Sequence, residues 1–335
     1  MATHLSEDKV LIWAAKKGYH EIVECLVKKE TDVNARDCSN FTSLHQASWY
    51  GHQDIVECLI KYGANVESRD NTHKTPLHMA AQNGHCGVVE ILIENGAKIE
   101  AKIKKSYDRP LHLAAMAGHE EVLQCLIKNG SIVDSRDNDD YTPLHMAAQN
   151  GHYKAVECLI KNGAEIEAKV KKNHDRPLHL AAKEGHCEIV QLLTMNGAEI
   201  EAKLKDNLYT ALHLSAILGH HDVVECLIEN GAEIDARDLK NLSPVHYANK
   251  FGDHEIVKYL MNKKEENDTK SNFEEHNSKK IICRVCLEPP DASYILLGCG
   301  HMPFCSECSK HLLDTSNPKC PICRKNVKDR HRAFL

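Results

Sequence analysis

The sequence lacks long apolar runs and has no excess of positive charge. No stretch approaches the ~20 consecutive apolar residues that a membrane-spanning helix needs, and the first residues, Met1 to Asp8, do not have the pattern of a signal peptide. The formal net charge of the 335 residues is −6, so the composition offers no electrostatic attraction for nucleic acid or an anionic membrane. We therefore expect neither nucleic acid nor a membrane as a partner.

A pattern of 33 or 34 residues repeats eight times along most of the chain. Each copy has an anchoring aliphatic residue, followed seven positions later by a glycine. The anchors are Leu11, Leu44, Leu77, Leu111, Leu144, Leu178, Leu212 and Val245. Four copies read Thr-Pro-Leu-His or Arg-Pro-Leu-His around the anchor, as at 75–78. The pattern resembles the ankyrin repeat, which implies a mostly α-helical solenoid of about eight helix-turn-helix repeats over residues 6–262.

Each part of the repeat has a physical task. Thr75 is a residue type that caps helix N-termini, and Pro76 suits the first helical position, where a missing N–H costs nothing. Gly84 can end the first helix in a left-handed conformation. The apolar residues of 88–93 then form the buried stripe of a second helix, which Asn95 and the glycine after it stop. Since one repeat cannot bury these faces alone, we expect stability to come from stacking on neighbours.

One histidine per repeat follows the anchor, and a second follows most of the glycines. In ankyrin repeats the first imidazole bonds neighbouring backbone, and the resemblance implies the same here. A metal-binding role is the alternative, but one copy per repeat is too dispersed for the imidazoles to share an ion. The histidines are His45, His78, His112, His145, His179, His213 and His246. The Gly-His pairs, such as Gly84-His85, are interpreted as scaffold on the same argument.

Lysines recur on successive loops between repeats. Met79 to His85 also recurs unchanged as Met146 to His152, which indicates internal duplication in pairs of repeats. The lysines could line a ridge that attracts an acidic partner, or they could be a solvated surface retained through duplication. They are Lys102, Lys104, Lys105, Lys169, Lys171, Lys172, Lys203 and Lys205.

Five of the fifteen cysteines stand at one position of the repeat, where other copies have Ile91, Leu192 and Tyr259. A position that accepts these residues is an apolar packing site, so we interpret the five as reduced core thiols without a redox role. They are Cys25, Cys58, Cys125, Cys158 and Cys226. Reduced thiols beside metal-type cysteines favour an intracellular protein, in the cytoplasm or the nucleus.

The last part of the chain carries eight potential metal ligands. Eight ligands fill two tetrahedral zinc sites and leave no position for water, so we expect two zinc ions with a structural task. They are Cys283, Cys286, Cys299, His301, Cys305, Cys308, Cys320 and Cys323. Their order and spacing resemble the RING finger of ubiquitin ligases, a small α+β cross-brace domain that would occupy residues 281–335. Residues 263–280, polar with one aromatic, are expected to form a flexible linker, helical at most in the first turn.

The resemblance to RING fingers also assigns the ligands to two interleaved sites. Cys283, Cys286, Cys305 and Cys308 would hold one zinc ion. Cys299, His301, Cys320 and Cys323 would hold the other. His311 is the rival ligand, but the one-residue spacing between Cys299 and His301 favours His301.

RING ligases orient a ubiquitin-conjugating enzyme and its ubiquitin thioester without a covalent intermediate. The resemblance implies docking of the conjugating enzyme on Val285, Leu312 and Pro321. It makes Arg324 the linchpin residue, which forms hydrogen bonds to both ubiquitin and that enzyme. The planar guanidinium of arginine suits two such partners better than the ammonium group of lysine. Phe334 and Leu335 resemble the tail of the dimeric RINGs of the inhibitor-of-apoptosis family, which implies a RING homodimer; a frayed tail is the alternative.

Together these patterns predict a RING-type ubiquitin ligase whose ankyrin repeats bind the substrate protein. The partners would be ubiquitin, a ubiquitin-conjugating enzyme and a protein substrate of unknown identity. The alternative is a non-enzymatic ankyrin adaptor with a structural or dimerising zinc module.

Overall fold

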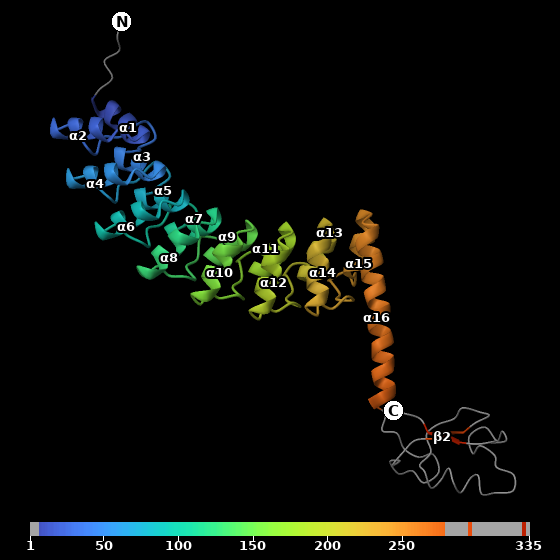
Figure 1. Ribbon diagram of the computed structural model, residues 1–335. Coiled ribbons are helices and arrows are strands. Elements are labelled where there is room, and N and C mark those ends of the chain that lie inside the picture. Colours follow the sequence, from blue (N-terminus) through green and yellow to red (C-terminus); the bar gives the residue numbers. More distant parts are fainter. Residues whose placement is uncertain (1–6, 279–293, 297–329, 333–335) are drawn as a thin grey trace, which may run out of the picture. The chain divides into compact units, whose positions relative to one another are not determined.

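Helices pair along the chain in the order that the repeat predicts (Figure 1). The computed structural model describes residues 7–278, 294–296 and 330–332, and the side chains of residues 7–267. The first helices of the pairs are α1 (Glu7–Lys17), α3 (Ser43–Tyr50), α5 (Pro76–Gln82), α7 (Pro110–Ala117), α9 (Pro143–Gln149), α11 (Pro177–Glu184), α13 (Ala211–Leu218) and α15 (Pro244–Phe251). The second helices are α2 (His20–Lys28), α4 (Gln53–Lys61), α6 (Cys86–Glu94), α8 (Glu120–Lys128), α10 (Tyr153–Lys161), α12 (Cys187–Met195), α14 (His221–Glu229) and α16 (His254–Ser278).

The first helices start and stop where local chemistry dictates. In α9, the hydroxyl of Thr142 accepts from the backbone N–H of His145, and Pro143 occupies the first helical position. In α7, Gly118 ends the helix with a φ of 77°, a conformation that a side chain resists. The predicted ankyrin solenoid of eight helix pairs is therefore confirmed.

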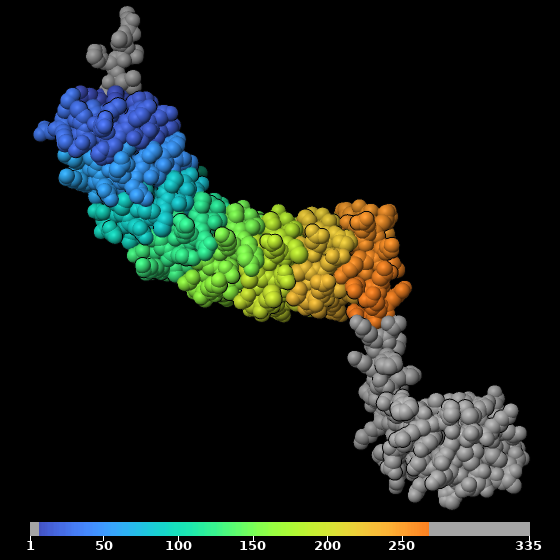
Figure 2. All heavy atoms as spheres, in the orientation of Figure 1, coloured from blue at the N-terminus to red at the C-terminus, as the bar shows by residue number. Residues whose placement is uncertain are grey.

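The core is a continuous layer between the two rows of helices. The first helices of repeats one to seven each contribute a buried leucine and two small residues, such as Leu77, Ala80 and Ala81 in α5. Each second helix contributes apolar residues at helical spacing, such as Val122 and Leu126 in α8. First helices pack on first helices, and second helices on second helices, so each repeat is covered by its neighbours. Figure 2 shows the repeats abutting one another as successive colour bands.

The loops between repeats are of two kinds. In most of them an aspartate organises the turn: Asp70 Oδ1 accepts from the backbone N–H groups of Thr72 and Lys74, both at 2.8 Å. In the lysine-bearing loops a buried apolar residue replaces this aspartate. There Ile103 N donates to the carbonyl of Asp108 at 3.0 Å, which closes a longer turn from backbone alone. These loops place their lysines on the surface.

The chain divides into two compact units, Met1–Leu260 and Met261–Leu335. In the second unit, β1 (Tyr294–Leu296) and β2 (Arg330–Arg332) pair antiparallel, with Ile295 opposite His331. Among the residues described, no helix is both long and apolar enough to cross a membrane.

The segment predicted to be a flexible linker differs from the expectation, because α16 continues to Ser278 instead of ending within its first extra turn. Lys263 Nζ lies 3.1 Å from Glu266 Oε2 across one helical turn, and lysine and glutamate are good helix formers. The predicted role of residues 263–280 as a tether stays a prediction.

Candidate functional site

The eight predicted zinc ligands, from Cys283 to Cys323, lie outside the described residues. So do the rival ligand His311, the predicted docking residues Val285, Leu312 and Pro321, the linchpin Arg324, and the tail residues Phe334 and Leu335. The described part of this region is the β1–β2 pair, which joins a strand between the predicted ligands Cys286 and Cys299 to one after Cys323.

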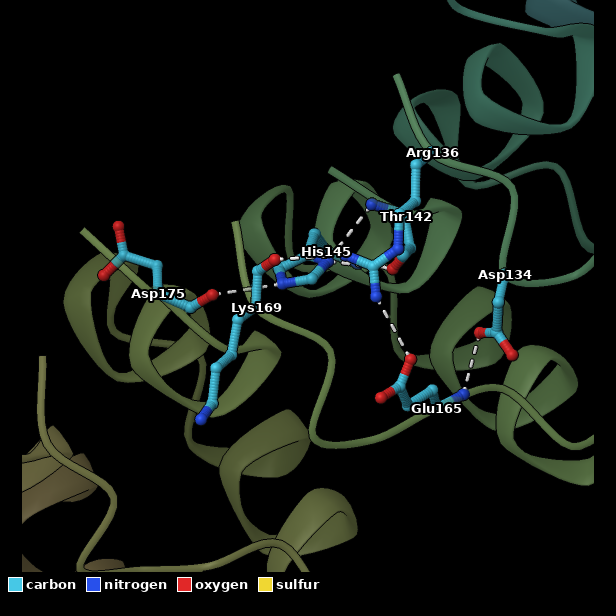
Figure 3. A network of polar contacts seen from close by, with 7 residues as sticks. All are labelled: Asp134, Arg136, Thr142, His145, Glu165, Lys169 and Asp175. Carbon is cyan, nitrogen blue, oxygen red and sulfur yellow. Dashed lines mark hydrogen bonds and ion pairs between the residues drawn. The ribbon is translucent and has the colours of Figure 1, made fainter. Parts of the chain in front are cut away.

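The array offers a rigid surface because polar contacts join its repeats. Figure 3 shows one such network around α9. Arg136 donates from Nη1 to the carbonyl of Lys169 at 3.2 Å and pairs through Nη2 with Glu165 Oε2 at 3.2 Å. Glu165 N in turn donates to Asp134 Oδ1 at 2.8 Å. These contacts link consecutive loops directly, so the loop tips are held in register.

Six of the seven repeated histidines are buried and bond backbone, as the ankyrin resemblance implied, whereas His246 in the last repeat is exposed. His145 Nδ1 accepts from the backbone N–H of Thr142 at 3.1 Å, so Nε2 carries the hydrogen and donates to the carbonyl of Asp175 at 3.2 Å. That carbonyl belongs to the loop of the following repeat. Burial lowers the pKa of His145 to about 4, and therefore this imidazole is neutral at physiological pH.

The Gly-His pairs join each repeat to the one before it. His152 Nε2 donates to the carbonyl of Met116 at 3.0 Å, and its ring lies over Gly118. A Cβ atom on Gly118 would stand 2.5 Å from His152 Nδ1. The same stacking recurs from Gly18 with His52 to Gly185 with His220. These pairs are scaffold, as predicted.

Exposed aromatic side chains gather on the first two repeats. Both tryptophans of the chain are among them: Trp13 on α1 is 47% exposed and Trp49 on α3 is 36% exposed. Tyr19 packs against Trp13 with ring centroids 5.3 Å apart, and Lys16 Nζ lies 5.8 Å from the ring centroid of Tyr50. A hollow of about 210 Å³ beside Trp49 is lined by residues of α3 together with Lys16 of α1, Phe41 and Met79 of α5. Such aromatics are typical of protein contact surfaces.

Sequence reasoning missed this aromatic surface. Trp49 stands at the repeat position that Lys16, Gln82 and Gln149 occupy elsewhere. The available signal was a tryptophan at a position that lysine or glutamine occupies in five of the other seven repeats.

The loop lysines are exposed, and none of these eight described side chains lies within salt-bridge distance of an acidic side chain. Lys203 Nζ contacts the carbonyl of Arg237 at 3.3 Å, and Lys102 Nζ lies 5.5 Å from the ring centroid of Tyr107. The neighbouring glutamates are engaged with arginines instead, since Arg109 Nε lies 2.7 Å from Glu100 Oε2. Positive charge on the loops is therefore available to a partner.

Four of the five repeated thiols are buried, as predicted for core packing. Cys58, Cys125, Cys158 and Cys226 are covered by the preceding repeat. Burial is the main reason that the pKa of Cys125 rises to about 12, so this thiol stays protonated at neutral pH. Cys25 is an exception to the prediction: it is exposed, because the first repeat has no preceding repeat to cover it.

Comparison with known proteins agrees with this geometry. The family model for ankyrin repeats (3 copies) matches residues 11–103, 101–170 and 178–272. The chain therefore belongs to the ankyrin-repeat family. A second family model, the zinc finger of C3HC4 type (RING finger), matches residues 279–330, so a zinc-binding RING follows the array. The crystal structure of the human ASB11 ankyrin repeat domain is similar, with a TM-score of 0.62, 28% identity, and coverage of 67% of this chain and 98% of that one.

Curated relatives match shorter parts of the chain. The E3 ubiquitin-protein ligase APD2 of Arabidopsis thaliana is 33% identical over 61 residues, which is 18% of this chain and 13% of that protein. A putative inhibitor of apoptosis from Sus scrofa is 31% identical over 100 residues, which is 29% of this chain and 25% of that protein. The chain thus spans a quarter or less of the length of these two relatives.

Proposed function

We propose that this chain is a RING-type ubiquitin ligase whose ankyrin array binds the substrate protein. The observation that carries the proposal is the RING finger match at residues 279–330, directly after the array. The similarity to a protein named as an E3 ubiquitin ligase and to inhibitors of apoptosis supports the same activity. In this proposal the array selects the substrate, and the RING brings the ubiquitin-loaded conjugating enzyme to it.

The donor set fits two zinc ions. Seven cysteines and one histidine complete two tetrahedral sites. One site would be formed by Cys283, Cys286, Cys305 and Cys308, and the other by Cys299, His301, Cys320 and Cys323. Zinc would supply folding energy to the module and no reaction step. The chemical contribution falls to side chains on the folded surface: Val285, Leu312 and Pro321 dock the conjugating enzyme, and Arg324 fixes its ubiquitin in a reactive orientation.

Autoubiquitination in a purified reaction tests the activity. We expect Val285→Ala to slow ubiquitin-chain formation by roughly tenfold or more, since the loss of ~1.4 kcal/mol of docking energy changes binding by a factor of ten. Zinc content measured on the same samples is the control for folding. A wild-type chain that is zinc-loaded but transfers no ubiquitin with any conjugating enzyme would instead support the non-enzymatic adaptor.

Arg324 is tested separately, because its proposed role begins after the conjugating enzyme has docked on the RING. We expect Arg324→Ala to retain conjugating-enzyme binding and zinc while ubiquitin discharge from the loaded enzyme is lost. Arg324→Lys is the matched control: it keeps the charge but not the planar fork, so it should restore little discharge. Unchanged discharge by Arg324→Ala would remove the proposed role.

We further propose that the RING forms a homodimer through its C-terminal tail. The pairing of β2 with β1 supports this, since β2 ends at Arg332, two residues before Phe334 in the sequence. Light scattering of the full chain should give the mass of a dimer, and deletion of Phe334 and Leu335 should lower ubiquitin transfer. A monomer whose activity survives the deletion would exclude the dimer.

The array has two candidate substrate surfaces, the aromatic surface around Trp49 and the exposed loop lysines. Proximity labelling in cells with wild type, Trp49→Ala and a triple Lys169→Ser, Lys171→Ser, Lys172→Ser variant would distinguish them. We place the protein inside the cell, in the cytoplasm with the nucleus as the alternative. The free thiols of the described residues support this location.

A further inference from the structure

Two cysteines outside the repeated packing position lie beside a packing cysteine of the next repeat. Cys86 is the first residue of α6, and its side chain meets Cys125 on α8. Cys187, the first residue of α12, stands in the same relation to Cys226 on α14. In the other second helices of repeats one to seven, this first position holds His20, Gln53, Glu120, Tyr153 and His221. Paired thiols therefore occur at two interfaces of the array.

The first of these pairs has a third potential ligand. Glu90 lies four residues after Cys86, one turn further along the same face of α6. The two sulfur atoms and one carboxylate oxygen of Cys86, Glu90 and Cys125 all lie within 4.8 Å of one another. In the second pair the position of Glu90 is occupied by Gln191, a neutral amide. The two interfaces thus present the same thiols with and without a carboxylate.

The geometry points to a zinc site formed by Cys86, Glu90 and Cys125, distinct from the predicted RING sites, with one coordination position left for water. Thiolate sulfur and carboxylate oxygen are both established zinc ligands. Two sulfur atoms bound to one tetrahedral zinc ion lie roughly 3.8 Å apart. Side-chain rotations that bring the ligand atoms about 1 Å closer together would therefore give the geometry of a zinc site. Cys86 and Glu90 reach the surface, which gives a metal ion access, whereas Cys125 is buried.

The surroundings suit a cation. Two thiolates and a carboxylate would carry three negative charges. The two thiols share a hydrogen bond, and Asn129 Nδ2 lies 3.8 Å from Cys125 Sγ. As a thiol, Cys86 has weak contacts, to Cys125 and to the carbonyl of Glu121 at 3.8 Å, so little is lost when its proton is displaced. A bound ion would join α6 to α8 across the boundary between two repeats and stabilise their stacking.

A disulfide is the rival use of the same pair. It would need an external two-electron oxidant to take up the electrons that the two thiols lose. Zinc binding needs no electron transfer, because each thiol only releases its proton as the metal–sulfur bond forms. The pair is therefore better suited to a metal ion than to oxidation.

Zinc analysis of the full chain tests the site by difference. After equilibration at a buffered free zinc concentration, wild type should hold one zinc ion per chain more than Cys86→Ser or Glu90→Gln. Glu90 is exposed, so Glu90→Gln removes a ligand without altering the core. Cys187→Ser is the matched control and should hold as much zinc as wild type. Gln191→Glu should gain one zinc ion, because it gives the second pair its missing carboxylate.

The difference design makes the result independent of how many ions the RING holds. An unchanged zinc content in both Cys86→Ser and Glu90→Gln would overturn the proposal. The loss of one zinc ion in Cys187→Ser would also overturn the proposal, since a pair of thiols without a carboxylate would then bind zinc as well. A thiol titration that finds two fewer thiols in wild type than in reduced protein, with no extra zinc, would identify a disulfide instead.

Discussion

At the scale of single residues, one histidine and one glycine make a contact between neighbouring repeats in six of the seven pairs. The imidazole of His152 needs the space above Gly118 in order to reach the carbonyl of Met116. The sequence predicted that the Gly-His pairs are scaffold. It could not show that the histidine serves the preceding repeat, because the contact joins residues that are 36 positions apart.

The glycine under the histidine can be tested by adding a methyl group. We expect Gly118→Ala to lower the free energy of unfolding by about 1–3 kcal/mol more than Gly130→Ala does. Both glycines have a positive φ, 77° and 95°, but a Cβ on Gly130 would have no atom within 4 Å, so the difference isolates the clash with His152. Urea denaturation followed by circular dichroism measures both. If both variants lost the same free energy of unfolding, the cost would come from the backbone conformation alone and not from the clash with His152.

Two positions show what residue-level prediction could not give. Arg109 and Arg176 stand where other repeats have a threonine or serine cap, and arginine has no acceptor for the helix N-terminus. Their guanidinium groups instead bind glutamates of the adjoining loops, and Arg176 Nη1 lies 2.7 Å from both Glu167 Oε2 and Glu199 Oε2. In these two repeats an ion pair with a loop glutamate therefore takes the place of the helix cap, which is visible only once the loops are folded.

At the scale of helices and loops, each buried imidazole makes the stability of the array depend on pH. His78, His112, His145 and His179 have pKa values lowered to about 4, mainly by burial. In the unfolded chain the value is about 6.5, so between these values the unfolded state binds more protons than the folded state. The free energy of unfolding should therefore be greatest above about pH 6.5 and should fall as the pH drops toward 4.

Thermal unfolding at pH 7.5, 6.5 and 5.5 measures this effect, with helical circular dichroism reporting on the array. We expect a lower melting temperature at each step down. Asp137 and Asp175, whose pKa values burial raises, act in the opposite sense, but chiefly nearer their ordinary pKa of about 4. The variant His145→Gln should show a weaker dependence on pH, because it lacks one titrating group. A melting temperature that does not change over this range would contradict the mechanism.

The elements themselves were largely predictable, and the exceptions have physical causes. The positions of the helix pairs follow from repeated prolines, glycines and apolar stripes, which act locally. The length of α16 was not foreseen, because the sequence of residues 263–278 has one aromatic residue and no apolar stripe that would indicate a helix. The proximity of Cys86 to Cys125 depends on how one repeat is rotated against the next. The sequence of a single repeat does not determine that rotation.

At the scale of the whole molecule, the two units depend on different forces. The array is held by apolar burial and by backbone contacts between repeats, whereas folding of the proposed RING is linked to its metal ions. Its ligands lie outside the described residues, so the zinc assignment still rests on the spacing and on the family match at 279–330. The aromatic surface around Trp49 became apparent only once the helices were in place.

Removal of metal should separate the two units. We expect a strong chelator to abolish ubiquitin transfer while the helical circular dichroism of the chain falls only slightly, since the described helices of the array contain none of the RING ligands. Activity that returns when zinc is added back would establish that the loss is reversible. A collapse of the helical signal on chelation would contradict the separation.

The stacking of repeats also affects the order of events during synthesis. Side-chain hydrogen bonds between neighbouring repeats join positions only 23 to 39 residues apart, so each repeat can dock as soon as the next one leaves the ribosome. All eight RING ligands follow residue 282 and emerge after the array. If the proposed function holds, a nascent chain could therefore bind its target before it can transfer ubiquitin, and synthesis of the RING would be the step that completes the ligase.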